Sequence, residues 1–479
     1  MTQIAAAPAP IGSRPSLWSR GRRVASKRRS PEVASRSIVV ITVGLGIVSA
    51  YAIGRGFAEI PLLLAIGVLG ISQLFRLSLY GWCVLLILAT VVSRGPVAIG
   101  GLPQVLNFIH YPLVMAFGLA ALMHASPRPR GRETRPSAWL LYLLGLCVAS
   151  MAVSVSHPLR LVVFVMIVGE PLLVIWAIHR WSPDEQTLVR LGKLVLVIMA
   201  IQVPIGVFQG LALGWTDPVQ GTLTGHGAGH HVLGGLFAVG LCLSVAALHA
   251  RKVSRGRGLL AAFVCLAMIQ ATGSLSVMVA VCFAIVSANL LARPKGSRGG
   301  MRVGALVSGL VIAAGGIYSI EVIVPGTLTR AMDLVSMEDM PEIEITSERL
   351  TSDIPAAWFG SGPGTAASRA SILLVADEFA EGSPLAALDL PPTELGLEYA
   401  RKTRNIHGGS AEDYKSSTMS FAGDLGILGL IAVVAFIVSL VRMMRRRSNW
   451  IALGTLAAIL MTAAISLIDN WLEYPEYTV

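Results

Sequence analysis

Three histidines in a glycine-rich stretch form the first group of residues that could do chemistry. His226, His230 and His231 lie in the segment 221–231, whose glycines allow a backbone or a ligand to approach closely. On a helix His226 and His230 would share a face, a spacing that suits zinc, but no cysteine or carboxylate pattern completes such a site. We therefore expect no metal, and either a polar pocket for an acidic or sugar group or a loop whose histidines only meet an interface.

An arginine and a glycine-rich turn form the second group. Arg349 follows Ser347 and Glu348, and residues 358–364 read Trp-Phe-Gly-Ser-Gly-Pro-Gly. A guanidinium can clamp phosphate oxygens, and the amides of a turn with several special backbone angles can line an anion site. Each feature also has an ordinary interpretation, namely a salt bridge from Arg349 to Glu344 or Glu348 and a simple reversal of the chain.

Six further residues form the third group, which contains the densest cations of an otherwise acidic segment. They are Arg401, Lys402, Arg404, His407, Tyr414 and Lys415. His407 is a candidate general base, because imidazole titrates near neutral pH. The cations would bind an anionic partner, for which a lipid pyrophosphate would serve. Pairing of the cations with Glu398, Glu412 and Asp413 is the alternative.

The second and third groups lie in one long polar segment, residues 321–418. This segment holds 16 of the chain's 27 carboxylates but only seven of its 38 lysines and arginines. A long apolar run precedes it and another follows it. Because the rest of the chain is strongly basic, we expect the acidic segment to form a domain of its own.

The remainder of the chain has the composition of a polytopic membrane protein. Of its 479 residues 54% are hydrophobic and 14% are charged, whereas a soluble chain carries roughly 25% charged residues. Helices satisfy all backbone hydrogen bonds within a bilayer. The five cysteines lie within apolar runs and form no disulfide framework or metal motif. Runs of near ~20 apolar residues predict an all-α fold of about 12–13 transmembrane helices with one large extracytoplasmic loop domain.

The distribution of lysine and arginine predicts the orientation in the membrane. The net charge of +11 comes mainly from short connections between apolar runs, so we reject nucleic acid as a partner and apply the positive-inside rule. The predicted organisation is a basic cytoplasmic tail at 1–36, transmembrane helices at 37–320 with a tight outer hairpin at 272–274, the extracytoplasmic loop domain at 321–418, and the last helices and C-terminal tail at 419–479. Twelve, thirteen and fourteen spans all remain open.

The order of these features resembles the O-antigen ligase and O-antigen polymerase family. The features are a Gly-Thr motif at 221–222, Arg349 and then a Phe-Gly-x-Gly-x-Gly turn in a large outer loop, and a histidine-containing segment that leads into Gly-Ile-Leu-Gly at 426–429. The resemblance covers residues 221–440 in order and the N-terminal half only as hydropathy. It implies a metal-independent glycosyltransferase of the bacterial cytoplasmic (inner) membrane that needs no cofactor.

The resemblance also implies a substrate and residue roles. Such enzymes take a glycan from undecaprenyl pyrophosphate at the outer face of the membrane, and transfer it to another glycan (polymerase) or to a lipid acceptor (ligase) in surface polysaccharide biosynthesis. By position, Arg349 would hold the pyrophosphate and His407 would activate the acceptor hydroxyl. The candidates for substrate binding are Arg401, Arg404, Tyr414, Lys415, His226, His230 and His231.

Two departures from the family pattern leave alternatives open. The family histidine usually lies closer to the Gly-Ile-x-Gly segment, where this chain has Tyr414 and Lys415, so either residue could be its equivalent. Many members have Ser-Arg-Gly where this chain reads Gly-Ser-Leu-Ser at 273–276. Arg401 or Arg404 would then have to supply the missing cation.

A membrane transporter or lipid-linked-glycan flippase is the alternative function. Glu170 precedes a proline in the middle of the apolar run 161–178 and is costly to place in a membrane, so we expect it to be paired, protonated or a coupling carboxylate. The proline would kink the helix. Interhelical hydrogen bonds are expected for His110, Gln202 and Gln209.

Overall fold

The computed structural model is entirely helical, apart from turns, in the part of the chain that it describes. That part consists of residues 75–92, 109–123, 136–181, 183–215, 218–223, 229–291, 318, 341–352, 354–366, 368, 370–371, 390–406, 417–445 and 450–467. The chain divides into two units, Met1–Gln73 and Leu74–Val479, and every described residue belongs to the second. The predicted all-α class is confirmed for these residues.

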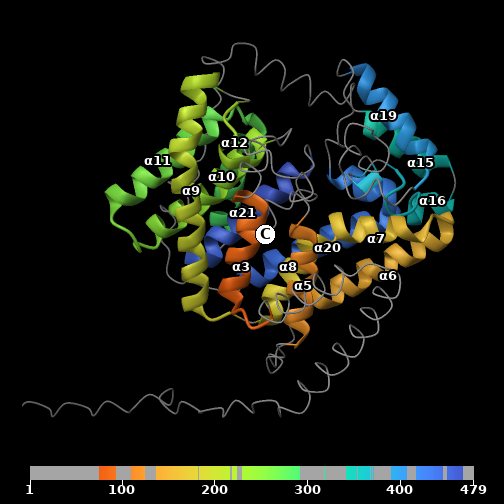
Figure 1. Cartoon of the computed structure of the whole chain (residues 1–479), viewed down its shortest axis with the longest axis horizontal. Helices are drawn as coiled ribbons and strands as arrows, with labels where there is room; N and C mark the ends of the chain where they lie inside the picture. Colours follow the sequence, from red (N-terminus) through yellow and green to blue (C-terminus); the bar gives the residue numbers. More distant parts are fainter. Residues whose placement is uncertain are drawn as a thin grey trace, which may run out of the picture. The chain divides into compact units, whose positions relative to one another are not determined.

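Figure 1 shows the helices along the chain. They are α3 (Leu79–Ile87) with a π-helical turn (Leu88–Val92), α5 (His110–Met123), α6 (Pro136–Ser154), α7 (Pro158–Ile167), α8 (Glu170–Trp181), α9 (Glu185–Leu213), a 3-10 turn (Gly221–Leu223), α10 (Gly229–His249), α11 (Arg255–Ala271), α12 (Leu275–Leu291), α15 (Pro341–Ser352), α16 (Ile354–Phe359), α19 (Glu394–Ile406), α20 (Ser417–Arg445) and α21 (Trp450–Ile465).

Three apolar cores hold these helices together. The first joins α9, α10, α11, α12 and α21 around buried residues such as Phe237. The second joins α6, α7 and α20, with the ring of Phe164 edge-on to that of Phe421 at a centroid distance of 6.4 Å. The third joins α3, α5 and α8 around Trp82 and Phe117. The second core carries the candidate site described below.

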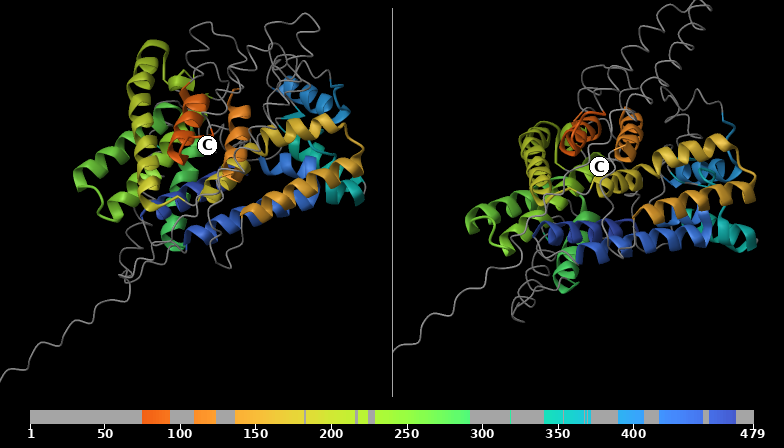
Figure 2. Two further views of the ribbon diagram at one scale, coloured as in Figure 1. Left: turned by 60° about the horizontal axis from the view of Figure 1, so that its bottom comes forward. Right: turned by 90° about the horizontal axis from the view of Figure 1, so that it is seen from below.

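The described part of the acidic segment is docked onto the second core. Helices α15 and α16 contact α20, α16 also contacts α6, and α19 contacts α15. Figures 1 and 2 show α15 and α16 beside the same end of α6 and α7 in each view. Helix α19 turns Tyr399 and Ala400 inward, where both are buried, and leaves Arg401 exposed. The segment is therefore attached to the helical bundle.

Several helices have the length and composition to cross a membrane. Three described helices meet both conditions, Gln186–Leu213, Gly229–His249 and Ser417–Arg445, and α7 with α8 would make a fourth if the bent pair is one span. Five further apolar helices are shorter. The predicted spans near 37–53, 57–74 and 303–320 lie outside the described residues, so the predicted number of spans stays a prediction.

The apolar run 161–178 forms two helices with a sharp bend between them, where we expected a kink. Helix α7 ends at Ile167, α8 begins at Glu170, and their axes differ by 59°. Pro171 lies in the first turn of α8, where its missing N–H costs no hydrogen bond, so the chain breaks before the proline. The predicted bend near Pro171 is therefore found, and Glu170 lies at the start of the second helix.

The expected hairpin at 272–274 is confirmed. Helix α11 ends at Ala271, α12 begins at Leu275, and Gly273 between them has a φ of +66°. A side chain at Gly234 of α10 would meet the hydroxyl of Ser274 at 2.8 Å. The hairpin therefore packs closely against the start of α10.

Candidate functional site

Two glycines bring the backbone of the turn 358–364 into direct contact with helix α20. Gly426 interrupts α20 with φ +67° and ψ −164°. A Cβ there would lie 2.5 Å from the carbonyl carbon of Trp358, and a Cβ at Gly360 would lie 2.4 Å from that of Asp424. Both glycines have positive φ, so a side chain at either position would meet strain as well as a clash. The turn is seated on the kink of α20.

The amides of this turn bind an anion, and the anion is the chain's own carboxylate. Asp424 is fully buried and accepts hydrogen bonds from the amides of Gly364 and Ala366, each at 2.8 Å. The amide of Gly362 donates to the carbonyl of Asp424 at 3.1 Å, and that of Ser361 donates to the carbonyl before it at 2.9 Å. The interpretation of these amides as a site for a ligand's anion was therefore wrong.

Two helices of the bundle complete this contact. The hydroxyl of Ser150 on α6 lies within hydrogen-bond distance of the carbonyl oxygens of Phe359 (2.5 Å) and Asp424 (3.0 Å). Arg160 on α7 is buried and donates to the carbonyls of Gly364 (2.9 Å) and Pro391, and its charge interacts with that of Asp424. A buried guanidinium with carbonyl partners near a carboxylate is balanced in charge and hydrogen bonds.

Sequence reasoning missed Ser150, Arg160 and Asp424. A signal was present for two of them, because Arg160 and Asp424 are charged residues at the ends of apolar runs. Buried charges of this kind are rare unless they are paired. No local sequence pattern indicated that the turn 358–364 is the common partner of these residues.

Arg349, the residue predicted to hold pyrophosphate, lies beside the turn. It comes from the last turn of α15 and donates from Nε to the hydroxyl of Ser361 at 3.3 Å. Its side chain is half-buried. The structure brings Arg349 and the glycine turn together, and the hydrogen-bond partner of Arg349 is Ser361 rather than Glu344 or Glu348.

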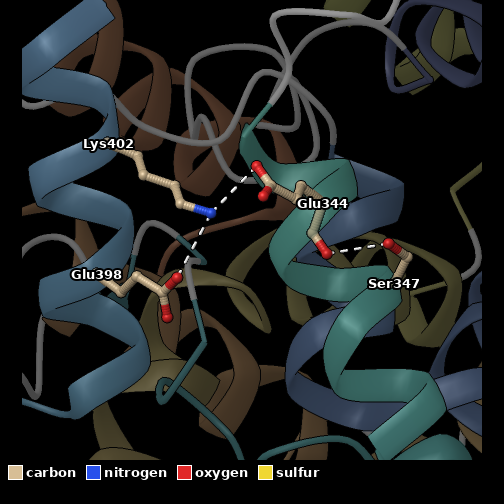
Figure 3. Close-up of polar contacts among 4 residues, drawn as sticks. All are labelled: Glu344, Ser347, Glu398 and Lys402. Carbon is tan, nitrogen blue, oxygen red and sulfur yellow. Dashed lines mark hydrogen bonds and ion pairs between the residues drawn. The ribbon is translucent and has the colours of Figure 1, made fainter.

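The third group of predicted residues is only partly described. Figure 3 shows Lys402 between Glu344 on α15 and Glu398 on its own helix, with Nζ–Oε distances of 3.1 Å and 3.4 Å. Partial desolvation lowers the pKa of Lys402, but its interactions with Glu344, reinforced by Glu398, outweigh this and raise the pKa above its ordinary value. The alternative of cation pairing is therefore confirmed for Lys402, and Arg401 is exposed to solvent.

Helix α19 is also tied to the glycine turn. The hydroxyl of Thr393 donates to the carbonyl of Thr365 at 2.7 Å and accepts from the amide of Gly396 at 3.1 Å, as an N-cap residue does. This contact fixes the start of the helix that carries Arg401 and Lys402. The side chain of Arg404 and the whole of His407, Tyr414 and Lys415 lie outside the described residues, so their roles stay predictions.

The histidine group is likewise only partly described. His230 and His231 lie in the first turn of α10 with their ring centroids 4.0 Å apart, and the hydroxyl of Ser274 donates to the carbonyl of His230 at 3.4 Å. His226 lies outside the described residues. Among the described residues no cluster of three or more histidines, cysteines or carboxylates could hold a metal ion.

Two glutamines of α9 hold the turn that leads to α10. Gln209 accepts from the amide of Gly221 (2.6 Å) and donates to its carbonyl (2.9 Å). Gln202 donates to the hydroxyl of Thr222 (2.7 Å) and accepts from its amide (2.8 Å), and this hydroxyl donates to the carbonyl of Val91. Interhelical hydrogen bonds were expected for both glutamines. In the structure both glutamines bond to the 3-10 turn at Gly221–Leu223 rather than to another α-helix.

An apolar cavity of about 280 Å³ lies beside α20. Its walls come from α6, α8, α20 and α21, with Phe421 and Leu440 marking two ends of α20. Phe421 lies one turn before Asp424, and the other lining residues of α20, between Ala432 and Leu440, follow the kink at Gly426.

A second buried polar pair lies at the break between α7 and α8. His110 Nε2 and Glu170 Oε2 are 3.5 Å apart, and each side chain is at most 2% exposed. Each residue lies at the N-terminus of its helix, α5 and α8, where the helix dipole favours a carboxylate. Of the alternatives considered for Glu170, pairing with His110 is the one found.

No family model matches the sequence, and no curated protein matches it at a significant level.

Proposed function

We propose that this chain is a membrane glycosyltransferase that transfers a glycan from undecaprenyl pyrophosphate to a glycan or lipid acceptor. The observation that carries the proposal is a cation beside the first part of α20 together with an apolar cavity further along the same helix. Arg349 is held at the turn seated on Asp424, and the cavity is lined on α20 by Phe421 and by residues between Ala432 and Leu440. The proposed donor has two corresponding parts, namely a pyrophosphate that a cation can bind and an isoprenoid chain that an apolar cavity can bind.

The chemistry follows from these groups. A base removes the proton of the acceptor hydroxyl, and the oxygen attacks the anomeric carbon of the donor sugar. The bond from that carbon to the pyrophosphate oxygen breaks, and the pyrophosphate leaves on its lipid. Arg349 would stabilise the charge on the leaving group, and His407 is the candidate base by resemblance.

Exposed apolar side chains favour insertion of the bundle in a membrane. Phe208 and Leu211 on α9 are 71% and 75% exposed, and Phe263 on α11 is 67% exposed. Each would cost about 1.5–3 kcal/mol relative to burial in an apolar medium. Soluble proteins rarely expose such residues side by side.

The charges at the helix ends favour an outer location for the docked turn. Helix α20 begins at Ser417 and carries Arg442 and Arg445 in its last turn. Arg445 donates to the carbonyl of Leu291 at the end of α12. Helix α8 has Arg180 in its last turn. Under the positive-inside rule these cationic ends face the cytoplasm, and the glycine turn is at the other end of α20.

The proposal is tested with purified protein in lipid vesicles that contain an undecaprenyl-pyrophosphate-linked glycan. We expect a product of greater glycan length, or a glycan on a lipid acceptor, with release of undecaprenyl pyrophosphate. Deletion of the gene distinguishes the two activities, because single repeat units accumulate on the carrier without a polymerase and long chains accumulate without a ligase. Unchanged carrier-linked glycans after deletion would contradict the proposal.

Transport of a lipid-linked glycan is the second candidate, favoured by the broken pair α7–α8 and the buried contact of His110 with Glu170. Discontinuous helices with a buried carboxylate at the break are found at transporter binding sites. For the proposed transferase we expect Glu170→Gln to retain glycan transfer in vesicles. Loss of glycan translocation in this variant, with transfer intact, would instead support a transporter.

A further inference from the structure

We infer that Asp424 is a positioning residue for the transfer reaction, because its carboxylate fixes the glycine turn and, through Ser361, the guanidinium of Arg349. This inference rests on the proposed function. Asp424 would not touch the substrate. It would act by holding the backbone that in turn holds Arg349.

The contacts form a short unbroken chain. The two oxygens of Asp424 accept from the amides of Gly364 and Ala366, both at 2.8 Å. The same turn includes Ser361, whose amide donates to the carbonyl of Gly423 on α20 and whose hydroxyl accepts from Arg349. The location of the guanidinium is therefore set by α20 through one turn of backbone.

Two acceptor oxygens are needed at this position. An asparagine has the shape of aspartate but only one acceptor, and its NH₂ group would face the second backbone amide. The site is fully buried, so water cannot replace the lost hydrogen bond, and an unsatisfied buried donor is costly. Arg160 would also lose a favourable electrostatic interaction with Asp424. We expect the turn to detach or shift in such a variant.

A shift of the turn would affect the reaction more than the fold. The cores of the bundle do not depend on Ser361, whereas a misplacement of about 1 Å at a charge-stabilising group can cost about 10²-fold in rate. We therefore expect Asp424→Asn to reduce kcat by about 10²-fold per folded molecule, with a small change in KM for the donor. A general loss of folding would reduce the amount of active protein and leave kcat per folded molecule unchanged.

The test combines transfer assays in vesicles with labelling by a membrane-impermeant maleimide. The native cysteines are all buried, so a cysteine in place of the buried Ser371 reports on the turn. We expect Asp424→Asn to increase its labelling rate by about tenfold. Ser352→Cys at an exposed site of α15 serves as the control and should label equally in both backgrounds.

A second variant separates the two steps of the inference. Ser361→Ala removes the partner of Arg349 and leaves the carboxylate contacts in place, so it should lower kcat without exposing the cysteine at 371. Because both changes act through Arg349, the double variant with Asp424→Asn should transfer no more slowly than Asp424→Asn alone. Additive losses would overturn the inference, and so would normal kcat and labelling in Asp424→Asn. Absence of transfer by the wild-type protein would instead refute the proposed function, and the labelling result would still show whether Asp424 holds the turn.

Discussion

Arg349→Ala is expected to reduce glycan transfer by roughly 10²–10³-fold, the usual effect of removing a group that stabilises developing charge in the transition state. The guanidinium is held at the turn by a hydrogen bond to Ser361, so its orientation is fixed before the donor binds. The loss should appear in kcat, because the negative charge on the pyrophosphate grows as the sugar leaves. The measurement is the initial rate of transfer in vesicles.

Arg349→Lys separates the effect of the positive charge from that of the guanidinium shape. Lysine keeps the charge but lacks the planar fork that reaches two phosphate oxygens, so we expect a rate between those of the wild type and the alanine variant. Lys252→Ala, at an exposed connection between α10 and α11, is the matched control for the loss of a cation and should transfer normally. Wild-type rates in Arg349→Ala would remove this residue from the mechanism.

Gly360→Ala and Gly426→Ala are each expected to lower stability by roughly 2–5 kcal/mol, from backbone strain at positive φ together with overpacking. The added methyl groups would meet main-chain atoms at 2.4–2.6 Å, and main-chain atoms cannot swing away as a flexible side chain can. The five buried cysteines provide the measurement, because a thiol-reactive fluorescent dye labels them only as the protein unfolds on heating.

Gly145→Ala and Gly192→Ala are the matched controls. Both lie within helices, and nothing lies within 4 Å of the position of an added Cβ. Alanine is favoured over glycine in a helix by up to about 1 kcal/mol, so the unfolding temperature should stay constant or rise. A similar decrease in unfolding temperature for all four variants would contradict the prediction. It would mean that Gly360→Ala and Gly426→Ala do not act by disturbing the contact of the turn with α20.

The sequence predicted the special geometry of the turn but not its partner. Glycines at 360, 362 and 364 indicated unusual backbone angles, and their φ values are +74°, +104° and +66°. Asp424 is 60 residues further along the chain, and no local spacing connects the two. The sequence therefore left an anion site and a simple chain reversal open, and the structure shows that the amides bind the chain's own carboxylate.

The hairpin between α11 and α12 and the hydrogen bonding of Gln202 and Gln209 could be predicted because their causes are local or general. A Thr-Gly-Ser stretch between apolar runs makes a turn, and a buried amide must find a partner. The break before Glu170 could not be located from the proline alone. A proline ends a hydrogen-bond ladder upstream of itself, and only packing decides whether the chain kinks or starts a new helix.

The seat of the turn on α20 is built almost wholly of main-chain atoms, glycines and one carboxylate. Such a contact requires a particular backbone conformation in the turn. It places no requirement on most of the side chains of the turn. Different extramembrane segments could be grafted onto the same bundle if they keep three glycines in register. A change of the proposed acceptor substrate would then require a new segment but no repacking of the helices of the bundle.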